Sequence, residues 1–474
     1  MASQGQLDVM MSYWFSAREF LLRAKNEVPT TNVMMFLGLI LIVVVRNYTA
    51  KPPKKRARKF DVADEDHFPP IEPLDKFDWK TTEPLQLRPY KPKYHLTMAL
   101  ENLDPNELIP MDKTYKERIA YRRTLLKEHH DVVLGINSPK NTNHKSNNDN
   151  DNGSPEDPRI REAVTELYEY VMGIYLPARY PTMFTLLETK LSDEQLLMVQ
   201  NRVTGEILPT SLSPNRPLIK ALETLVKTVD EDMLILLPEI DTNQKSTQKQ
   251  DAEPEDPRLV RRRKGGDGAV TAGEKRVEKK QHKSEEKKRE IYSLLENGDG
   301  STKYILEAYA ACYPSGFDTR KKLGKPLAKI HDPVPGYKEK LEKSMDRYFE
   351  RLEVGKYVKR ANWTVTTGAD LFAAFGGIHS TGKESMKELT VEALDLDNTY
   401  FRSERQTLYR LPISGAVVFS FHTYIYPIKQ IKEEGSGEDL AAAIDGVEAG
   451  SVPEMDRYKR IPVWGNAIKE YLTT

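Results

Sequence analysis

The stretch GAVVFSFHTY, residues 415–424, carries the clearest strand signal of the chain, because it is rich in β-branched and aromatic residues. Successive side chains of a strand point to opposite faces, so this stretch divides into two sets. The sets are Val417, Phe419 and Phe421 on one face, and Val418, Ser420, His422 and Tyr424 on the other. Residues 357–365 alternate in the same way and form a second predicted strand.

Helix-type spacing precedes these strands. One helix is expected to begin at Pro158 and another at Pro217, each with aliphatic residues three or four positions apart. A third is expected from Leu341 to Leu352, with Gly355 as its C-cap. Together these patterns predict an α+β fold in which helices surround a mainly antiparallel sheet.

Charge and cysteine content exclude several classes of protein. The 474 residues contain 71 Lys and Arg against 71 Asp and Glu, a balance that argues against a nucleic-acid partner. Cys312 is the single cysteine, so neither an intramolecular disulfide nor a multi-cysteine metal site can form. Hydrophobic residues make up 39% and charged residues 30%, which predicts that part of the chain lies outside any core.

Composition also predicts the organisation of the chain. One stretch rich in Asn, Asp and Ser and one that is highly charged cannot build a core, and we expect both to be disordered insertions. No standard nucleotide-binding, zinc-protease or hydrolase motif occurs. The expected parts are an N-terminal segment 1–28, a transmembrane anchor 29–50, a basic linker 51–67 and one domain 68–474, interrupted by insertions 137–157 and 241–290.

The predicted anchor is centred on VMMFLGLILIVVV, residues 33–45. This core spans only about 20 Å of a hydrocarbon layer of about 30 Å, so the flanks must complete the crossing. A buried core helix or a signal peptide fits less well, because a Pro-containing basic run follows and no cleavage site is visible. Seven cations at 46–59 against three at 18–32 place the large C-terminal part in the cytosol. We expect a single-pass protein of the endoplasmic reticulum membrane.

His331 is the first candidate for chemistry. It lies in LAKIHDPVP, residues 327–335, where Pro333 and Pro335 restrict the backbone. A stiff backbone carrying one imidazole suits an axial ligand of a heme iron, whose direction must be held. The alternative is a histidine that bonds a turn.

Three arginines, Arg402, Arg405 and Arg410, lie in FRSERQTLYRLP, residues 401–412. In a strand Arg402 and Arg410 share one face and Arg405 takes the other. Guanidinium groups suit carboxylates, including heme propionates. The alternative is a structural network in which Arg405 pairs with internal carboxylates.

The remaining candidates have weaker patterns. His422 could be a ligand, a substrate contact or a satisfied sheet histidine, and His379 could be a loop residue without a role. Cys312 lacks the flanking pattern of a thiolate heme ligand. Asp395 and Asp397 resemble the metal-binding pair of nucleotide-sugar transferases, but a surface loop is the simpler interpretation.

Several segments, in order along the chain, resemble the α subunit of the heme-dependent oxidative N-demethylases, a family of bacterial enzymes and fungal proteins. The most specific are LAKIHDPVP and ERQTLYRLPISGA, residues 404–416. The supporting segments are YHLTM at 94–98, MDKTYKERIAYRRTLL at 111–126, RYPTMF at 179–184, VDEDMLILLP at 229–238, YPSGF at 313–317 and NWTV at 362–365.

The resemblance implies a PAS-like fold that binds heme b and removes a methyl group from a small amine by oxidation. It implies His331 as the axial ligand of the heme iron, and Arg405, with Arg402 and Arg410, as contacts of the propionates. Electrons would come from an external reductase, because no flavin or iron–sulfur motif occurs in this chain. A non-catalytic heme sensor and, less favoured, a membrane-bound glycosyltransferase are the alternatives. His422 departs from the basic residue expected in relatives, which leaves the substrate open.

Overall fold

The computed structural model describes residues 68–137, 157–191, 194–239, 300–380 and 386–474. The chain divides into two units, 1–60 and 61–474, and every described residue belongs to the second. The predicted anchor, the basic linker and nearly all of both predicted insertions lie outside the described residues. Within the described ranges, no helix has the length and apolar character needed to cross a membrane.

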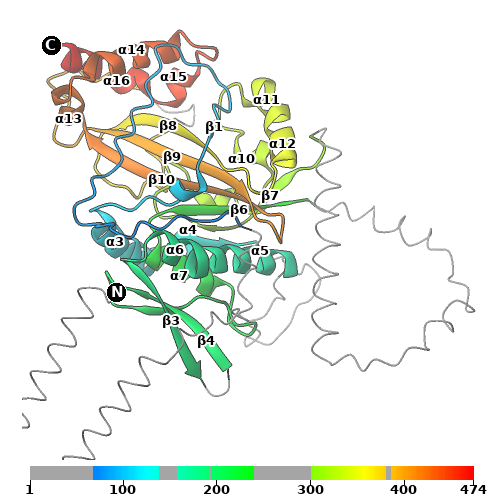
Figure 1. The fold of residues 1–474 in the computed structure, drawn as a ribbon. Helices are drawn as coiled ribbons and strands as arrows, with labels where there is room; N and C mark the ends of the chain where they lie inside the picture. Colours follow the sequence, from blue (N-terminus) through cyan, green and yellow to red (C-terminus); the bar gives the residue numbers. More distant parts are fainter. Residues whose placement is uncertain (1–67, 138–156, 192–193, 240–299, 381–385) are drawn as a thin grey trace, which may run out of the picture. The chain divides into compact units, whose positions relative to one another are not determined.

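The centre of the fold is a seven-stranded sheet in the order β1-β8-β9-β10-β6-β7-β2 (Figure 1). Every neighbouring pair is antiparallel, which confirms the predicted α+β fold with a mainly antiparallel sheet. The strands are β1 (Glu101–Asn102), β2 (Leu134–Ile136), β6 (Asp232–Pro238), β7 (Tyr304–Ala310), β8 (Val358–Thr366), β9 (Tyr400–Arg410) and β10 (Val417–Pro427).

The two longest strands, β9 and β10, form a hairpin whose register sets the faces of the sheet. Val417 pairs with Arg410 at one end and Pro427 with Tyr400 at the other. The connecting turn is held by the Glu166 carboxylate, which accepts hydrogen bonds of 2.7 Å from two successive backbone N–H groups, at residues 413 and 414. Because the register is fixed at the turn, the whole pattern of alternate side chains follows from it.

Helices cover both faces of the sheet (Figure 1). On the α3 face, Ile235 and Val418 pack against α3 (Tyr115–Glu128), α5 (Pro158–Glu169) and α7 (Ile219–Thr228). On the α12 face, Leu236 and Val417 pack against α10 (Leu327–Ile330) and α12 (Glu342–Arg351). Both faces are buried, which explains why β10 has few polar positions despite its strict alternation.

The predicted helices are present. Pro158 opens α5, where Asp157 accepts the N–H of Arg159 as N-cap, and α7 begins two residues after Pro217. The prediction of Gly355 as the C-cap of α12 was wrong. That helix ends at Arg351, and Gly355, at φ 84°, belongs to the following turn, where its freedom to adopt a positive φ is used.

Shorter elements complete the fold. A separate three-stranded sheet has the order β3-β4-β5. The remaining elements are β3 (Phe184–Leu191), β4 (Glu194–Asn201), β5 (Ile207–Pro209), α4 (His130–Val133), α6 (Leu176–Arg179), α11 (Tyr337–Lys340), α13 (Ile428–Glu433), α14 (Gly437–Glu448), α15 (Met455–Tyr458), α16 (Ile461–Thr473), the 3-10 turns η3 (Pro105–Glu107) and η7 (Thr319–Lys321), and the π-helical turn η4 (Tyr170–Tyr175).

A glycine in α14 allows a close backbone crossing. The Gly446 carbonyl accepts the Tyr94 N–H at 2.9 Å, and a Cβ on Gly446 would lie 2.5 Å from the Pro92 carbonyl oxygen. The Pro92 backbone cannot move aside as a flexible side chain could, so the added methyl group would clash with it. Gly446→Ala should therefore lower the free energy of unfolding by about 1–3 kcal/mol. Gly368→Ala is the matched control, because no atom lies within 4 Å of its Cβ position. Urea denaturation that gives equal midpoints for the two variants would contradict this expectation.

Candidate functional site

His331 is the residue directly after α10, at the helix C-cap. Its Nδ1 lies 2.8 Å from the Leu327 carbonyl oxygen, and its ring stacks on Tyr337 with 4.7 Å between centroids and 10° between planes. A carbonyl can only accept, so Nδ1 carries the proton and Nε2 keeps its lone pair. Burial lowers the pKa of His331 to about 4, so the imidazole is neutral at physiological pH. An oriented, neutral imidazole of this kind is typical of a metal ligand.

The backbone after His331 turns tightly, as its two prolines predicted. The Val334 N–H donates to the His331 carbonyl at 2.8 Å, and the Tyr337 N–H donates to the Val334 carbonyl at 3.2 Å. Gly336, at φ 70°, completes the turn before α11. The ring of His331 is therefore held both through its own backbone and through the tyrosine on which it stacks.

Three cations that lie near His331 or His379 are called the basic cluster: Lys322, Arg360 and Lys459. The charges of Lys322 and Arg360, after burial, contribute to the lowered pKa of His331. Lys459 is 3% exposed, and its Nζ donates to the Asn362 Oδ1 and the Trp363 carbonyl on strand β8. The cluster therefore brings together the loop before α10, the sheet and the end of α15.

His379, in the loop between β8 and β9, lies beside the basic cluster. Its ring stacks on Tyr458 at 4.5 Å and 10°, and its buried Nδ1 has no hydrogen-bond partner among the described residues. Burial lowers the pKa of His379 to about 3, with smaller contributions from Lys459, Arg402 and Lys322. The sequence pattern left this residue without a role, and the structure places it beside the same lysine as His331.

The three predicted propionate contacts take the faces that alternation predicted. Arg402 and Arg410 point to the α12 face and Arg405 to the α3 face. Arg402 donates to Ser315 Oγ and to the carbonyls of residues 313, 370 and 371. Arg405 donates to the carbonyls of residues 107 and 108, and Arg410 to those of residues 349, 352 and 415.

All three guanidinium groups are thus bonded largely to backbone carbonyls. Arg405 donates to two of these carbonyls, and its charge also acts on the buried carboxylate of Glu231, so the alternative of a network with internal carboxylates stays open. Only Arg402 and Arg410 share the face that α10 and His331 cover. Their contact with a propionate stays a prediction.

His422 lies on the α3 face, opposite Arg405 in the β9–β10 register. Its Nε2 is 3.6 Å from Asp230 and its Nδ1 is 3.7 Å from Glu231. Burial raises the pKa of Glu231, whereas Arg118, His422 and Arg122 outweigh burial and hold the pKa of Asp230 below its usual value. His422 therefore belongs to a buried ionic cluster on the other side of the sheet from α10.

The remaining candidates have structural partners. Asp395 accepts the backbone N–H groups of Asp397 and Asn398 in an exposed turn, and Asp397 pairs with Lys429 at 2.5 Å. Among the described residues, no group of three or more His, Cys, Asp or Glu side chains is arranged to hold a metal ion. Cys312 is buried, which raises the pKa of its thiol, so it is not a thiolate.

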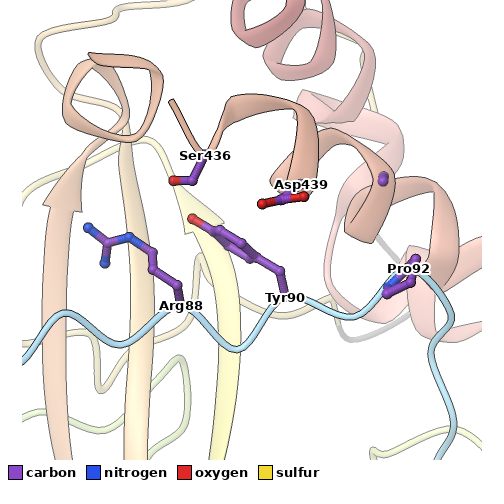
Figure 2. Close-up of a pocket in the computed structure, with 6 residues that line it drawn as sticks. Arg88, Tyr90, Pro92, Ser436 and Asp439 are labelled. Carbon is purple, nitrogen blue, oxygen red and sulfur yellow. The ribbon is translucent and has the colours of Figure 1, made fainter. Parts of the chain in front are cut away.

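A pocket of about 370 Å³ opens between the segment Arg88–Pro92 and the start of α14 (Figure 2). The Tyr90 side chain points from that segment toward Ser436 and Asp439. Arg88 pairs with Glu434 at 2.6 Å and lies over the Tyr426 ring at 3.8 Å. None of the residues that line this pocket belongs to the basic cluster, so we treat it as separate from the candidate site.

A comparison with protein-family models relates this geometry to known proteins. The model described as "Haem-dependent oxidative N-demethylase, alpha subunit-like" matches residues 99–249 and 284–469. The two matched segments contain every strand of both sheets, together with His331 and the basic cluster. The unmatched interval 250–283 falls inside the second predicted insertion. The predicted resemblance is confirmed, and the chain belongs to the heme-dependent oxidative N-demethylase α-subunit-like family.

Proposed function

We propose that this protein is a heme-dependent oxidoreductase that holds heme b on the α12 face of the sheet, with His331 as the axial ligand of the iron. The observation that carries the proposal is the fixed orientation of His331, whose Nδ1 is bound to the Leu327 carbonyl. Nε2 remains as the only ring atom that can coordinate. Heme dependence itself follows from the family.

The residues present fit the group. A histidine-ligated heme needs a neutral imidazole nitrogen, apolar surroundings for the porphyrin and positive charge for two propionates. His331 supplies the first and the core of the α12 face the second, and Arg402 and Arg410 on the same face are the predicted source of the third. The strand order β7-β6-β10-β9-β8, with α10 to α12 inserted between β7 and β8, supports a PAS-like arrangement around this site.

When bound, heme supplies oxygen activation and one-electron chemistry. The role of the protein is to hold the His331 ring in place. The hydrogen bond to the Leu327 carbonyl fixes the tautomer and raises the basicity of Nε2, and the stack on Tyr337 fixes the plane of the imidazole ring. The buried surroundings of the α12 face limit the access of water. We propose a small N-methylated amine as the substrate.

The electron balance implies a partner. Removing an N-methyl group as formaldehyde consumes one O2, two electrons and two protons, and it yields the demethylated amine and water. The proposal therefore includes an external electron-donor reductase. We also propose that residues 29–50 anchor the protein in a membrane, with the endoplasmic reticulum as the expected location and the large unit facing the cytosol.

The test is an absorption spectrum of the full-length protein expressed with a heme precursor. A Soret band that shifts on reduction with dithionite is expected. Single-turnover formaldehyde release from an N-methylated amine, after chemical reduction and exposure to oxygen, distinguishes the enzyme from a sensor, which would bind oxygen without product. A protein that stays colourless after titration with heme would overturn the proposal.

A further inference from the structure

We propose that the basic cluster, Lys322, Arg360 and Lys459, is a binding site for the two carboxylates of the porphyrin. This inference rests on the proposed function and assigns the anion contacts to residues other than the three arginines of β9. It follows from three observations: the three cations form no ion pair among the described residues, the acids near them supply too little negative charge, and the cations lie beside two histidines.

The three cations are buried or half-buried without an ionic partner. The Lys459 Nζ donates to an amide oxygen and a backbone carbonyl, and the Lys322 Nζ donates to the Ile330 carbonyl at 2.6 Å. The Arg360 Nε is buried and has no hydrogen-bond partner in the part of the chain that the structure describes. In those same ranges none of the three forms an ion pair with a carboxylate within 4 Å. Burying an unpaired charge is costly, so such a group is usually matched by a counter-charge.

The acids near the cluster supply only part of that counter-charge. Glu404 acts on both Lys459 and Arg360 and supplies one buried negative charge, because its hydrogen bonds from the neutral donors Ser315 Oγ at 2.5 Å and Gln406 Nε2 at 2.9 Å leave the carboxylate charged. Asp332, which acts on Lys322, is exposed and lies 3.4 Å from another lysine, Lys329. The cluster therefore holds more buried positive charge than negative charge.

The electrostatics of the three groups agree with this account. Burial lowers the pKa of Lys322 and of Lys459 to about 8 and lowers that of Arg360. An anion placed among them would reverse part of this effect by favouring the charged forms. Each lysine ammonium has three N–H groups, and among the described residues Lys322 donates one and Lys459 two, so donors remain for an anion. The Arg402 guanidinium, by contrast, already donates through Nε and both Nη atoms, and a ligand would have to displace those bonds.

The position of the cluster identifies the anion. The Lys322 Nζ donates to the carbonyl of Ile330, the residue before His331. Lys459 directly follows Tyr458, on whose ring His379 stacks, so the cluster lies beside both histidines of the candidate site. A group that coordinates through His331 and brings two carboxylates would neutralise the cluster as it binds. Heme b has this composition, and lysine and arginine are the usual donors to such carboxylates.

The test compares hemin with hemin dimethyl ester, which keeps the porphyrin and iron but lacks the two negative charges. Each is titrated into the full-length apoprotein, and binding is followed by the Soret band. Wild type is expected to bind hemin at least about tenfold more tightly than the ester. Arg360→Gln and Lys459→Gln are each expected to reduce that ratio several-fold, while binding of the ester itself stays within about twofold of wild type. Circular dichroism confirms that the variants are folded.

Lys329→Gln is the matched control, because Lys329 is exposed and lies in α10 two residues before His331. It should keep the wild-type ratio. Equal affinity of wild type for hemin and its ester, or an unchanged ratio in both Gln variants, would overturn the inference while leaving the proposed function intact. If neither porphyrin produces a Soret band, the proposed function fails and this inference fails with it.

Discussion

Replacing His331 by alanine is expected to weaken heme retention by at least about 10–100-fold and to shift the Soret band of any heme that remains. Mutation of a residue that only hydrogen-bonds a metal ligand typically lowers metal affinity by about 10–100-fold, so removal of the ligand itself should lower heme affinity at least as much. The cause is removal of Nε2, the nitrogen that the Leu327 carbonyl leaves free. Heme content is measured as the pyridine hemochrome per mole of purified protein.

Two further variants make this result specific. His379→Ala removes the other histidine near Lys322 and is expected to keep the heme content and the Soret position of wild type. In His331→Gly, added imidazole should restore the wild-type spectrum, because the free base can enter the space that the side chain leaves. The same heme content and spectrum in wild type and His331→Ala would remove the ligand assignment. Loss in His379→Ala instead would transfer it to that residue.

Local sequence predicted the faces of the sheet correctly because alternation needs no knowledge of distant residues. Arg402 and Arg410 on one face and Arg405 on the other follow from a period of two once β9 is a strand. The stiff turn at His331 was likewise visible from its prolines. These features depend on bonds within a few residues of each other, and such bonds are encoded locally.

The partners of these residues could not be predicted in the same way. The guanidinium groups of β9 reach carbonyls in residues 107–108, 313 and 349–352, and nothing in the local pattern shows that a carbonyl so far along the chain lacks a donor. The basic cluster gathers Lys322, Arg360 and Lys459 from three segments in which each is an ordinary cation. Its unpaired state becomes visible only when the fold removes these groups from water.

The buried ionic cluster on the α3 face is the second place where a single change should have a large effect. Arg122 is 1% exposed, and its Nη1 lies 2.7 Å from Asp232 while its Nη2 donates to the Glu231 carbonyl at 2.7 Å. Arg122→Met keeps much of the side-chain volume but leaves Asp232 as an unpaired buried carboxylate. We expect a loss of about 3–5 kcal/mol in the free energy of unfolding, measured by urea denaturation at pH 7.

The neighbouring arginine provides a control on the same helix. Arg123 pairs with Glu206, but its side chain is 30% exposed, so Arg123→Met should cost less than about 1 kcal/mol. Asp232 also accepts the backbone N–H groups of Cys312 and Tyr313, at 2.8 and 2.6 Å, which ties β6 to the chain that leaves β7. Those two bonds alone cannot replace a charged partner in a buried site, because the carboxylate keeps its full negative charge. A loss for Arg122→Met as small as that for Arg123→Met would show instead that these backbone donors suffice to stabilise Asp232.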